Sequence, residues 1–522
     1  MTRHPLLLLL FLLALALPAR AQTPPPAGSV LIRTGFEEAE ALGSWKAASN
    51  PNLALEPGFQ SPHALRVETT GDKPGSANAS LALDVSSWRG ATVRCEAMVR
   101  ADGVTKPPQP WNGVKCMLHL AAPGGDQWPQ QNNVFGTFDW KKIRFTTRIP
   151  ADTTSATLIL GLEAVQGRVW FDDVKITLER PPRVHPAQPP TGPVFTGHDQ
   201  PRLRGAMIGT NLSADDLREF GRDWKANHVR WQLCWGGFPR SPADHGDLAA
   251  YDAWLDGQLQ RLEGLLPVCR EAGLMVLIDL HTPPGGRDDS HNCRLFQEKR
   301  FQENFLSWWT KIARRFRDQP NIWGYDLVNE PVEGEIGEDC LSWRELAVAA
   351  ARAVRAEDAK HAIIVEPAPW GAPEAIDNLD PIPLPGIVYS VHMYVPHPFT
   401  HQGVYDSPVG PVYPGLIAGK EWNKEMLRKT LRPVVDFQRD FNVHIYLGEF
   451  SAIRWAPHDS ARQYLSDCID LFEEYHWDWA YHAFREWDGW SVEHGPDKNN
   501  HDRSPTPTSR ALMLREWYGK NR

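Results

Sequence analysis

The strongest constraint on the fold is an alternation in the C-terminal part of the chain, where short apolar runs and amphipathic stretches follow one another eight times. The apolar runs occupy residues 205–212, 228–233, 274–280, 322–328, 361–367, 387–394, 443–450 and 479–487. Between them lie stretches with helical periodicity, such as LDGQLQRLEGLLPVCREA. Continuous apolar strands that alternate with helices are typical of a parallel sheet buried on both faces. Eight such units predict a (β/α)₈ barrel over residues 203–522.

The preceding segment, residues 28–180, has a different pattern. Short runs rich in β-branched and aromatic residues recur, among them HALRVET, WKKIRFTTRI and RVWFDDVKITL, with Gly, Pro, Asn and Asp between them. This pattern predicts an all-β domain, an antiparallel sandwich or jelly roll. Residues 181–202 join the two segments and are rich in proline, which favours extended backbone and predicts a semi-rigid linker.

The N-terminus has the layout of an export signal. Residues 1–21 read MTRHPLLLLLFLLALALPARA, with a basic residue at Arg3, an apolar run at 6–17 and a small-x-small site ending at Ala21. We expect cleavage near Ala21 and a secreted protein, extracellular or periplasmic. The apolar run is shorter than the roughly 20 residues that span a bilayer, and no later stretch approaches that length, so no membrane partner is expected.

Charge and cysteine content narrow the partners further. The formal net charge of −9 argues against a nucleic-acid partner, which would need a basic surface. Export permits disulfides among the seven cysteines, and Cys293 with Cys340 forms a plausible pair because both fall within one predicted unit. Cys95 and Cys116 are a second plausible pair for the same reason. We expect a monomer.

Polar and aromatic residues stand at the carboxyl ends of the predicted barrel strands, where barrel enzymes build their active sites. These residues are Arg230, His281, Asn329, Glu330, His392, Tyr394, Glu449 and Trp487. Two of them are glutamates after the fourth and seventh strands, and glycoside hydrolysis requires two carboxyl groups that face each other. A single glutamate here could equally cap a helix or pair with arginine, but the whole set favours catalysis. Glu366, after the fifth strand, is a third carboxylate that we expect to support the site or touch the substrate.

The motifs around these positions resemble glycoside hydrolase family 5, the cellulase-type group of the retaining (β/α)₈ clan. The motifs are VRW (229–231), DLHTPPGG (279–286), LVNEP (327–331), HMY (392–394), GEF (448–450) and EWDGW (486–490). The resemblance implies that Glu330 is the acid/base and Glu449 the nucleophile of a double displacement with retention.

The same resemblance implies roles for the other strand-end residues. Asn329 would reach the sugar 2-hydroxyl, and Arg230 and Tyr394 would donate hydrogen bonds to Glu449. His392 would orient Glu330. His281 would line the subsite of the cleaved sugar, and Trp487 would form its floor by stacking. Further candidates for sugar stacking near strand ends are Trp235, Trp370 and Trp490.

Metal catalysis is the alternative that His281 and His392 raise, since both would point into the barrel mouth. Metal-dependent barrel hydrolases generally present two histidines from the first strand, whereas that strand here reads AMIGTNL. We therefore expect no cofactor for catalysis.

The N-terminal segment begins TGFEE and ends VWFDDVKI, and in both respects it resembles the jelly-roll carbohydrate-binding modules of polysaccharide hydrolases. Such modules often hold a structural calcium ion between their first and last strands. Glu37 and Asp173 stand at the corresponding ends, where they either bind calcium or form solvated acidic turns. Trp111 and Trp128 lie in polar, loop-like surroundings and either stack on sugar or cap the sandwich core.

Together these features predict a secreted retaining β-glycoside hydrolase that acts on a polysaccharide or oligosaccharide, in the first place an endo-β-1,4-glucanase (cellulase). The same chemistry on mannan, xylan or β-1,3-glucan, and exo-β-glucosidase action, remain alternatives because loops after the strands choose the sugar. A non-catalytic carbohydrate-binding barrel would be expected to lack a catalytic glutamate or its support, and none is lost here.

Overall fold

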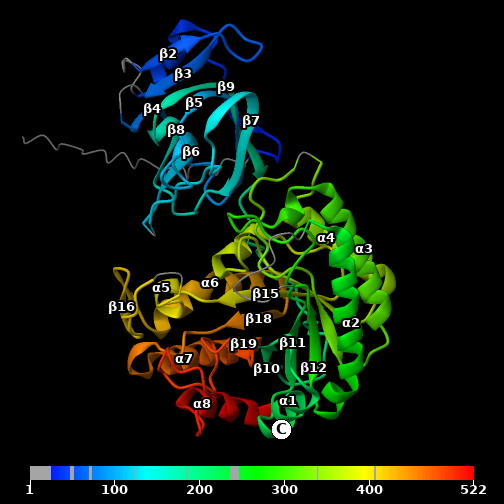
Figure 1. The fold of residues 1–522 in the computed structure, drawn as a ribbon. Coiled ribbons are helices and arrows are strands. Elements are labelled where there is room, and N and C mark those ends of the chain that lie inside the picture. Colours follow the sequence, from blue (N-terminus) through cyan, green and yellow to red (C-terminus); the bar gives the residue numbers. More distant parts are fainter. Residues whose placement is uncertain are drawn as a thin grey trace, which may run out of the picture. The chain divides into compact units, whose positions relative to one another are not determined.

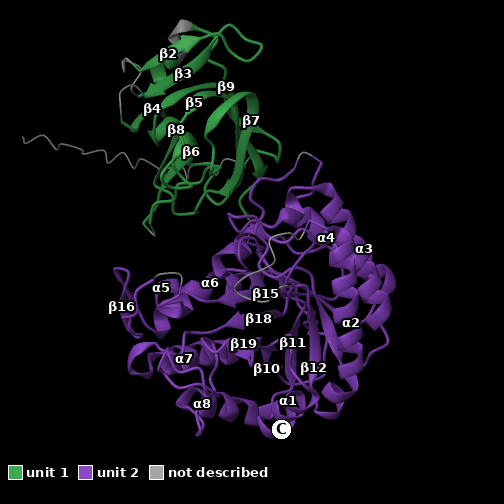
Figure 2. Cartoon of the chain, viewed as in Figure 1, with its two compact units in different colours: residues 1–183 green, residues 184–522 purple. Residues whose placement is uncertain are grey.

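The computed structural model describes residues 25–46, 52–69, 73–123, 125–183, 185–235, 246–337, 339–404 and 407–521. The chain divides into two compact units, Met1–Arg183 and Val184–Arg522 (Figure 2). The predicted signal peptide, residues 1–21, lies outside the described residues. None of the described helices combines the length and apolar character that a membrane crossing requires.

The N-terminal unit is an antiparallel β-structure of two sheets, as the sequence predicts. Its strands are β1 (Val30–Thr34), β2 (Leu53–Glu56), β3 (Ala64–Thr69), β4 (Gly75–Leu83), β5 (Thr92–Val104), β6 (Gly113–Ala121), β7 (Gly136–Arg148), β8 (Ser155–Val165) and β9 (Gly167–Arg180). One sheet has the order β2-β3-β9-β5-β7, with β1 paired to β9, and the other has the order β4-β8-β6. Residues at alternate positions, such as Leu158, Leu160 and Leu162 of β8, are fully buried in the shared core.

The C-terminal unit confirms the predicted barrel. Eight parallel strands of its described residues close into a ring in chain order (Figure 1). They are β10 (Arg204–Ile208), β11 (His228–Gln232), β12 (Met275–Asp279), β13 (Ile322–Asp326), β14 (Ala362–Val365), β15 (Ile387–Met393), β18 (Ile445–Phe450) and β19 (Asp478–Phe484). Side chains such as Leu277, Trp323 and Tyr446 fill the interior of the ring, so the barrel is a packed core.

Helices surround the strands and bury their apolar faces against them. They are α1 (Ala214–Arg218), α2 (Leu248–Glu271), α3 (Lys299–Phe316), α4 (Trp343–Glu357), α5 (His397–Thr400), α6 (Lys424–Phe441), α7 (Ser460–Glu474) and α8 (Ser509–Tyr518). A small hairpin of β16 (Gly415–Ile417) and β17 (Lys420–Trp422) follows α5. Short helical turns lie at Ala39–Ser44, Glu219–Asp223, Arg294–Phe296, Pro373–Asn378, Pro457–Asp459 and Gly519–Asn521.

Two glycines let barrel strands approach closely. A Cβ atom on Gly205 of β10 would lie 1.9 Å from the carbonyl oxygen of His228, and one on Gly324 of β13 would lie 2.4 Å from that of Ala362. Any larger residue would therefore push the neighbouring strand away.

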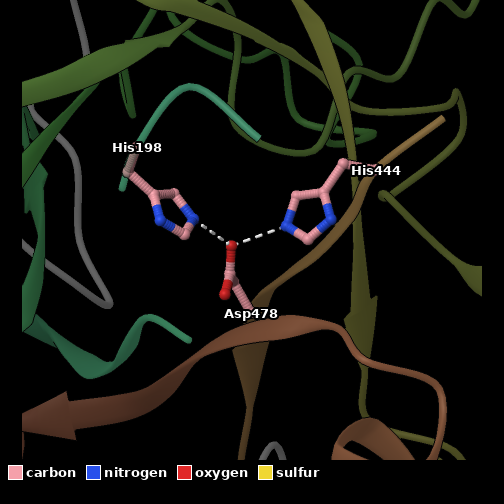
Figure 3. Close-up of side chains that lie close together, drawn as sticks. All are labelled: His198, His444 and Asp478. Atoms are coloured by element: carbon pink, nitrogen blue, oxygen red, sulfur yellow. Dashed lines mark hydrogen bonds and ion pairs between the residues drawn. The ribbon is translucent and has the colours of Figure 1, made fainter. Parts of the chain in front are cut away.

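The segment that precedes β10 is fastened to the amino-terminal end of the barrel. The imidazoles of His198 and His444 donate from Nε2 to one oxygen of Asp478, at 2.8 and 2.6 Å (Figure 3). The other oxygen of Asp478 accepts from the backbone N–H of Leu203 at 2.7 Å. The predicted linker covers residues 181–202. These hydrogen bonds hold its later part on the barrel, so only its first residues can act as a spacer.

Candidate active site

The ends of β13 and β18 bring the two predicted glutamates together. Glu330 lies four residues beyond the end of β13, and Glu449 is the penultimate residue of β18. One carboxylate oxygen of each residue lies within 4.8 Å of the other, and Nδ1 of His392 lies 2.9 Å from Glu330 and 3.7 Å from Glu449. Glu449 is almost completely buried, whereas the Glu330 side chain keeps 22% of its exposure.

Three side chains surround the carboxylate of Glu449. Arg230 donates from Nη1 at 2.6 Å, Tyr394 donates its hydroxyl at 2.8 Å, and Nδ1 of His482 lies 3.1 Å away. Burial opposes the charge on Glu449, but His392, His482 and Arg230 outweigh it and hold its pKa well below the ordinary value. Glu449 is therefore ionised, as a nucleophilic carboxylate must be.

Arg230 is fixed by a buried network beneath the two glutamates. Its guanidinium is fully enclosed, and Nη2 lies 2.9 Å from carboxylate oxygens of both Asp326 and Glu366 and 3.2 Å from Asp279. Burial opposes the charge, but the surrounding carboxylates raise the pKa of Arg230 well above its usual value. Because the guanidinium fork is rigid, these contacts aim Nη1 at Glu449.

Glu330 is held through both its side chain and its backbone. Its carboxylate accepts a hydrogen bond from Nδ1 of His392 at 2.9 Å. Its backbone, at φ +47° in the left-handed region, donates from N–H to Glu366 at 2.8 Å. Arg287 donates to its carbonyl oxygen at 2.8 Å. The peptide on which the acid/base candidate stands is thus clamped from two sides.

His392 carries a positive charge between the carboxylates. Burial opposes that charge, but Glu366, Glu449 and Glu330 outweigh it and raise the pKa of His392 well above the ordinary value. Glu366 is the carboxylate that was expected to support the site or to touch the substrate. It contacts Arg230, His392 and the backbone of Glu330, so it supports the site from below.

The side chains of Asn329 and His281 lie side by side. The side-chain oxygen of Asn329 accepts from Arg230 at 3.1 Å, which turns its amide nitrogen toward His281, 3.4 Å away. His281 in turn donates from Nδ1 to Asp279 at 2.9 Å. The amide of Asn329 therefore has a fixed orientation, with its N–H donors on the side of His281.

At β19 the structure adds a residue to those that the sequence predicts, and the stacking role of Trp487 stays a prediction. The residue of this strand that contacts Glu449 and Tyr394 is His482, not Trp487. Trp487 lies beyond the strand, with its ring over Gly489 and edge-to-face contacts to Trp455 and Trp490. The position of His482 could not be predicted from the sequence, because β19 pairs with β10 and β18 through register shifts, which change the residue that faces the barrel interior.

The other proposed stacking tryptophans divide by exposure. Trp370 is 41% exposed at the rim and packs on the guanidinium of Arg287 at 5.0 Å. Trp235 is partly buried and stacks on Trp254. Trp490 is buried among Tyr394, His401 and His482, so the prediction that it stacks on sugar is wrong: its faces are already covered.

The structure bears differently on the predicted disulfide and on the predicted calcium site. Cys293 and Cys340 are thiols and do not form the predicted disulfide; the Cys340 sulfur packs against Gly337 in its own turn. Asp173 is paired with Arg33 at 3.1 Å, and Glu37 joins no group of metal-binding side chains among the described residues. Calcium also binds backbone carbonyl oxygens, so the calcium site in this unit stays a prediction.

In the N-terminal unit, Trp111 and Trp128 are both about half exposed, at 54% and 50%. One face of Trp128 is covered by the parallel ring of His119, whose imidazole is held by Asp126 at 2.8 Å. The Trp111 carbonyl oxygen accepts from Lys115 and Gln130. The two rings therefore lie at the surface of the unit, next to residues that are held by hydrogen bonds, and neither ring caps the sandwich core.

Comparison with known proteins decides the family. A family model described as cellulase (glycosyl hydrolase family 5) matches residues 193–488, more than half of the chain. The chain belongs to glycosyl hydrolase family 5. It is thus a glycoside hydrolase of a retaining family, and the family implies a polysaccharide substrate.

Characterised relatives of this family 5 hydrolase are distant. Endoglucanase C of Acetivibrio thermocellus is 29% identical over 243 residues, which cover 42% of this chain and 70% of the relative. Cellodextrinase A of Ruminococcus flavefaciens is 26% identical over 260 residues, covering 48% and 74%. Among solved structures, one titled as a glycoside hydrolase aligns with a TM-score of 0.49 at 23% identity, covering 62% of this chain and 99% of that chain.

Proposed function

We propose that this family 5 hydrolase is a secreted endo-β-1,4-glucanase in which Glu449 is the nucleophile and Glu330 the acid/base. The observation that carries the assignment is the approach of the two carboxylates to within 4.8 Å. Inverting glycosidases keep their carboxyl groups about 6.5–9.5 Å apart to admit a water molecule, whereas retaining enzymes hold them about 5–5.5 Å apart.

The environments of the two glutamates support different roles. Glu449 is buried, ionised and directed by Arg230 and Tyr394, which suits attack on the anomeric carbon. Glu330 is the more exposed of the two and accepts only one side-chain hydrogen bond from the described residues, from His392. A carboxyl group in that position can reach a glycosidic oxygen.

In the first step, the Glu449 carboxylate attacks the anomeric carbon while the protonated Glu330 gives its proton to the leaving oxygen, so the glycosidic bond breaks and a glycosyl ester forms. In the second step, the ionised Glu330 takes a proton from water as the water oxygen attacks the same carbon. The ester bond breaks, Glu449 regains its charge, and the sugar leaves with retained configuration. The N–H groups of Asn329 would bind the 2-hydroxyl during both steps.

The substrate assignment rests on the relatives. Endoglucanase C is named for action on glucan and cellodextrinase A for action on cellodextrin. We extend the proposal to the N-terminal unit, where the exposed rings of Trp111 and Trp128 suit stacking on a polysaccharide. The export signal at residues 1–21 supports action outside the cytoplasm, where such polymers occur.

Proton NMR of the products tests the chemistry. We expect the β-anomer to appear first from a soluble β-1,4-glucan, before mutarotation. Glu330→Gln should lower kcat/KM on polymer by about 10²–10⁴-fold, the usual contribution of general acid catalysis. It should lose much less on aryl glycosides whose leaving group needs no proton. Glu449→Gln should lose activity on both, and an initial α-anomer would refute the proposal.

A substrate panel tests the specificity. Carboxymethyl-cellulose, mixed-linkage glucan, xyloglucan, glucomannan, laminarin, xylan and nitrophenyl glycosides should be compared at equal enzyme concentration. An endo-β-1,4-glucanase should reduce the viscosity of carboxymethyl-cellulose faster than it releases reducing ends. A clear preference for xylan, laminarin or a nitrophenyl glycoside would overturn the substrate assignment and leave the chemistry intact.

A further inference from the structure

A chain of three side chains leads away from the Glu449 carboxylate. The Tyr394 hydroxyl donates to Glu449 and is itself hydrogen-bonded to Nδ1 of His482. On the far side of the imidazole, Nε2 donates to Glu486 at 2.8 Å. With both ring nitrogens facing acceptors, His482 lies between two carboxylates, Glu449 and Glu486.

The surroundings keep this imidazole charged and immobile. The His482 side chain is 12% exposed, and its ring packs at 5.8 Å from that of Trp490. Burial opposes the charge, but Glu449 and Glu486 outweigh it and raise the pKa of His482 to about 10. The other titratable and charged groups around His482 and Glu449 are Arg230, His392, Tyr394, His401 and Glu486.

We propose that His482, held by Glu486, is a positioning residue that supplies a fixed positive charge to the nucleophile and fixes the hydroxyl of Tyr394 as its donor. Imidazolium Nδ1–H can donate to the tyrosine oxygen, so the tyrosine hydrogen is left for Glu449. Glu486, which contacts Nε2 of His482, acts only through that residue. The inference rests on the proposed role of Glu449 as nucleophile.

This arrangement predicts the direction in which the pKa of Glu449 changes when His482 is replaced. A cation within about 4–6 Å lowers a carboxyl pKa by roughly 1–3 units. Removing the charge of His482 should therefore raise the pKa of Glu449, and the nucleophile should be lost at a higher pH as the solution is acidified. Removing the Glu486 carboxylate should leave His482 protonated at neutral pH but lower the pKa of His482. The imidazole should therefore lose its proton at a lower alkaline pH.

The test is the pH dependence of covalent labelling by a 2-deoxy-2-fluoro-β-glucoside or cellobioside with a dinitrophenolate leaving group. Such a probe needs no acid catalysis, so its rate reports the ionised nucleophile, and mass spectrometry of the labelled peptide identifies Glu449. His482→Asn keeps a neutral donor near the position of Nδ1. We expect its acidic limb to lie about one pH unit or more above that of the wild type.

Glu486→Gln should keep the acidic limb of the wild type and lose labelling at a lower alkaline pH. Glu516→Gln, an exposed position on α8, is the charge-matched control and should behave as the wild type. An unshifted acidic limb in a folded His482→Asn variant, even with a lower rate at every pH, would overturn the proposal. If that variant does not fold, an alkaline limb in Glu486→Gln identical to that of the wild type would overturn it.

The wild type separates this inference from the function on which it rests. If the probe labels a residue other than Glu449, or none, the proposed function fails. If the wild type is labelled at Glu449 and the variants show no shift, only the role of His482 fails.

Discussion

Arg230 is a shared ion-pair partner of four buried carboxylates of the barrel. Its guanidinium contacts Asp279, Asp326, Glu366 and Glu449, and each of these carboxylates is buried. Burying a charge without a partner costs several kcal/mol, so the arginine stabilises the barrel centre as well as directing Glu449.

Arg230→Lys should therefore lower both stability and activity. Lysine keeps the charge but cannot serve several carboxylates with a planar fork, and breaking a buried ion pair typically costs about 3–5 kcal/mol. Thermal unfolding and kcat/KM on soluble glucan measure the two effects. Arg432→Lys, at an exposed position on α6, is the control, and a Tm for Arg230→Lys equal to that of the control would contradict the network.

His228, at the start of β11, should make the barrel sensitive to acid. It is fully buried beside Tyr446, and burial lowers its pKa to about 3. In the unfolded chain it takes up a proton below about pH 6.5, whereas in the folded chain it does not until pH 3. The free energy of unfolding should thus fall by up to about 1.4 kcal/mol per pH unit from this group as the pH drops from 6.5.

Urea unfolding at several pH values between 7 and 5 checks this. His228→Gln removes the titrating group, so its stability should depend less steeply on pH, whatever its absolute value. Equal slopes for the variant and the wild type would show that His228 is not the source.

At the residue scale, sequence alone predicted the glutamates and most of their partners because parallel strands end at one rim. Asn329, His281, His392 and Tyr394 meet there as expected. The place of His482 was not predictable in the same way. It depends on strand register to within one residue, and the aromatic Trp487 nearby was the more conspicuous signal.

At the scale of elements, the barrel strands were predictable because their runs are continuously apolar. Two strands of the N-terminal unit, β2 and β4, lacked such a signal. The β4 sequence GSANASLAL consists mostly of small residues without β-branched or aromatic side chains, and its pairing with β8 is set by tertiary contacts.

Gly324→Ala should destabilise the barrel. The added Cβ would meet the Ala362 carbonyl oxygen at 2.4 Å and the Ile364 side chain at 2.8 Å, so β13 and β14 would have to separate. Overpacking of this kind typically costs about 1–3 kcal/mol, measurable by thermal or urea unfolding.

Gly257→Ala is the matched control, because that helical position in α2 has open space around it. There the substitution should raise the free energy of unfolding by about 0.5–1 kcal/mol, since alanine favours helix over glycine. Similar effects of the two substitutions would contradict the close approach of β13 and β14.

At the scale of the whole molecule, each unit has its own hydrophobic core: one cluster in the N-terminal unit and two in the barrel unit among the described residues. Deletion of residues 25–183 should therefore leave a folded barrel with unchanged kcat/KM on soluble glucan. On insoluble cellulose the shortened enzyme should be slower, because a tethered binding unit raises the local substrate concentration. Reducing-sugar release from both substrates measures the difference, and equal losses on the two would argue against a binding role for the N-terminal unit.

The hydrogen bonds that Asp478 makes with His198 and Leu203 determine at which residue the N-terminal unit can be removed or exchanged without loss of contacts in the barrel. A chain that began at Arg204 would leave one oxygen of a buried carboxylate without its backbone donor and remove one of its two imidazoles. Exchange of the N-terminal unit for another module should instead be made before His185. The residues that look like a connector thereby travel with the enzyme, and any new partner unit must supply its own spacer.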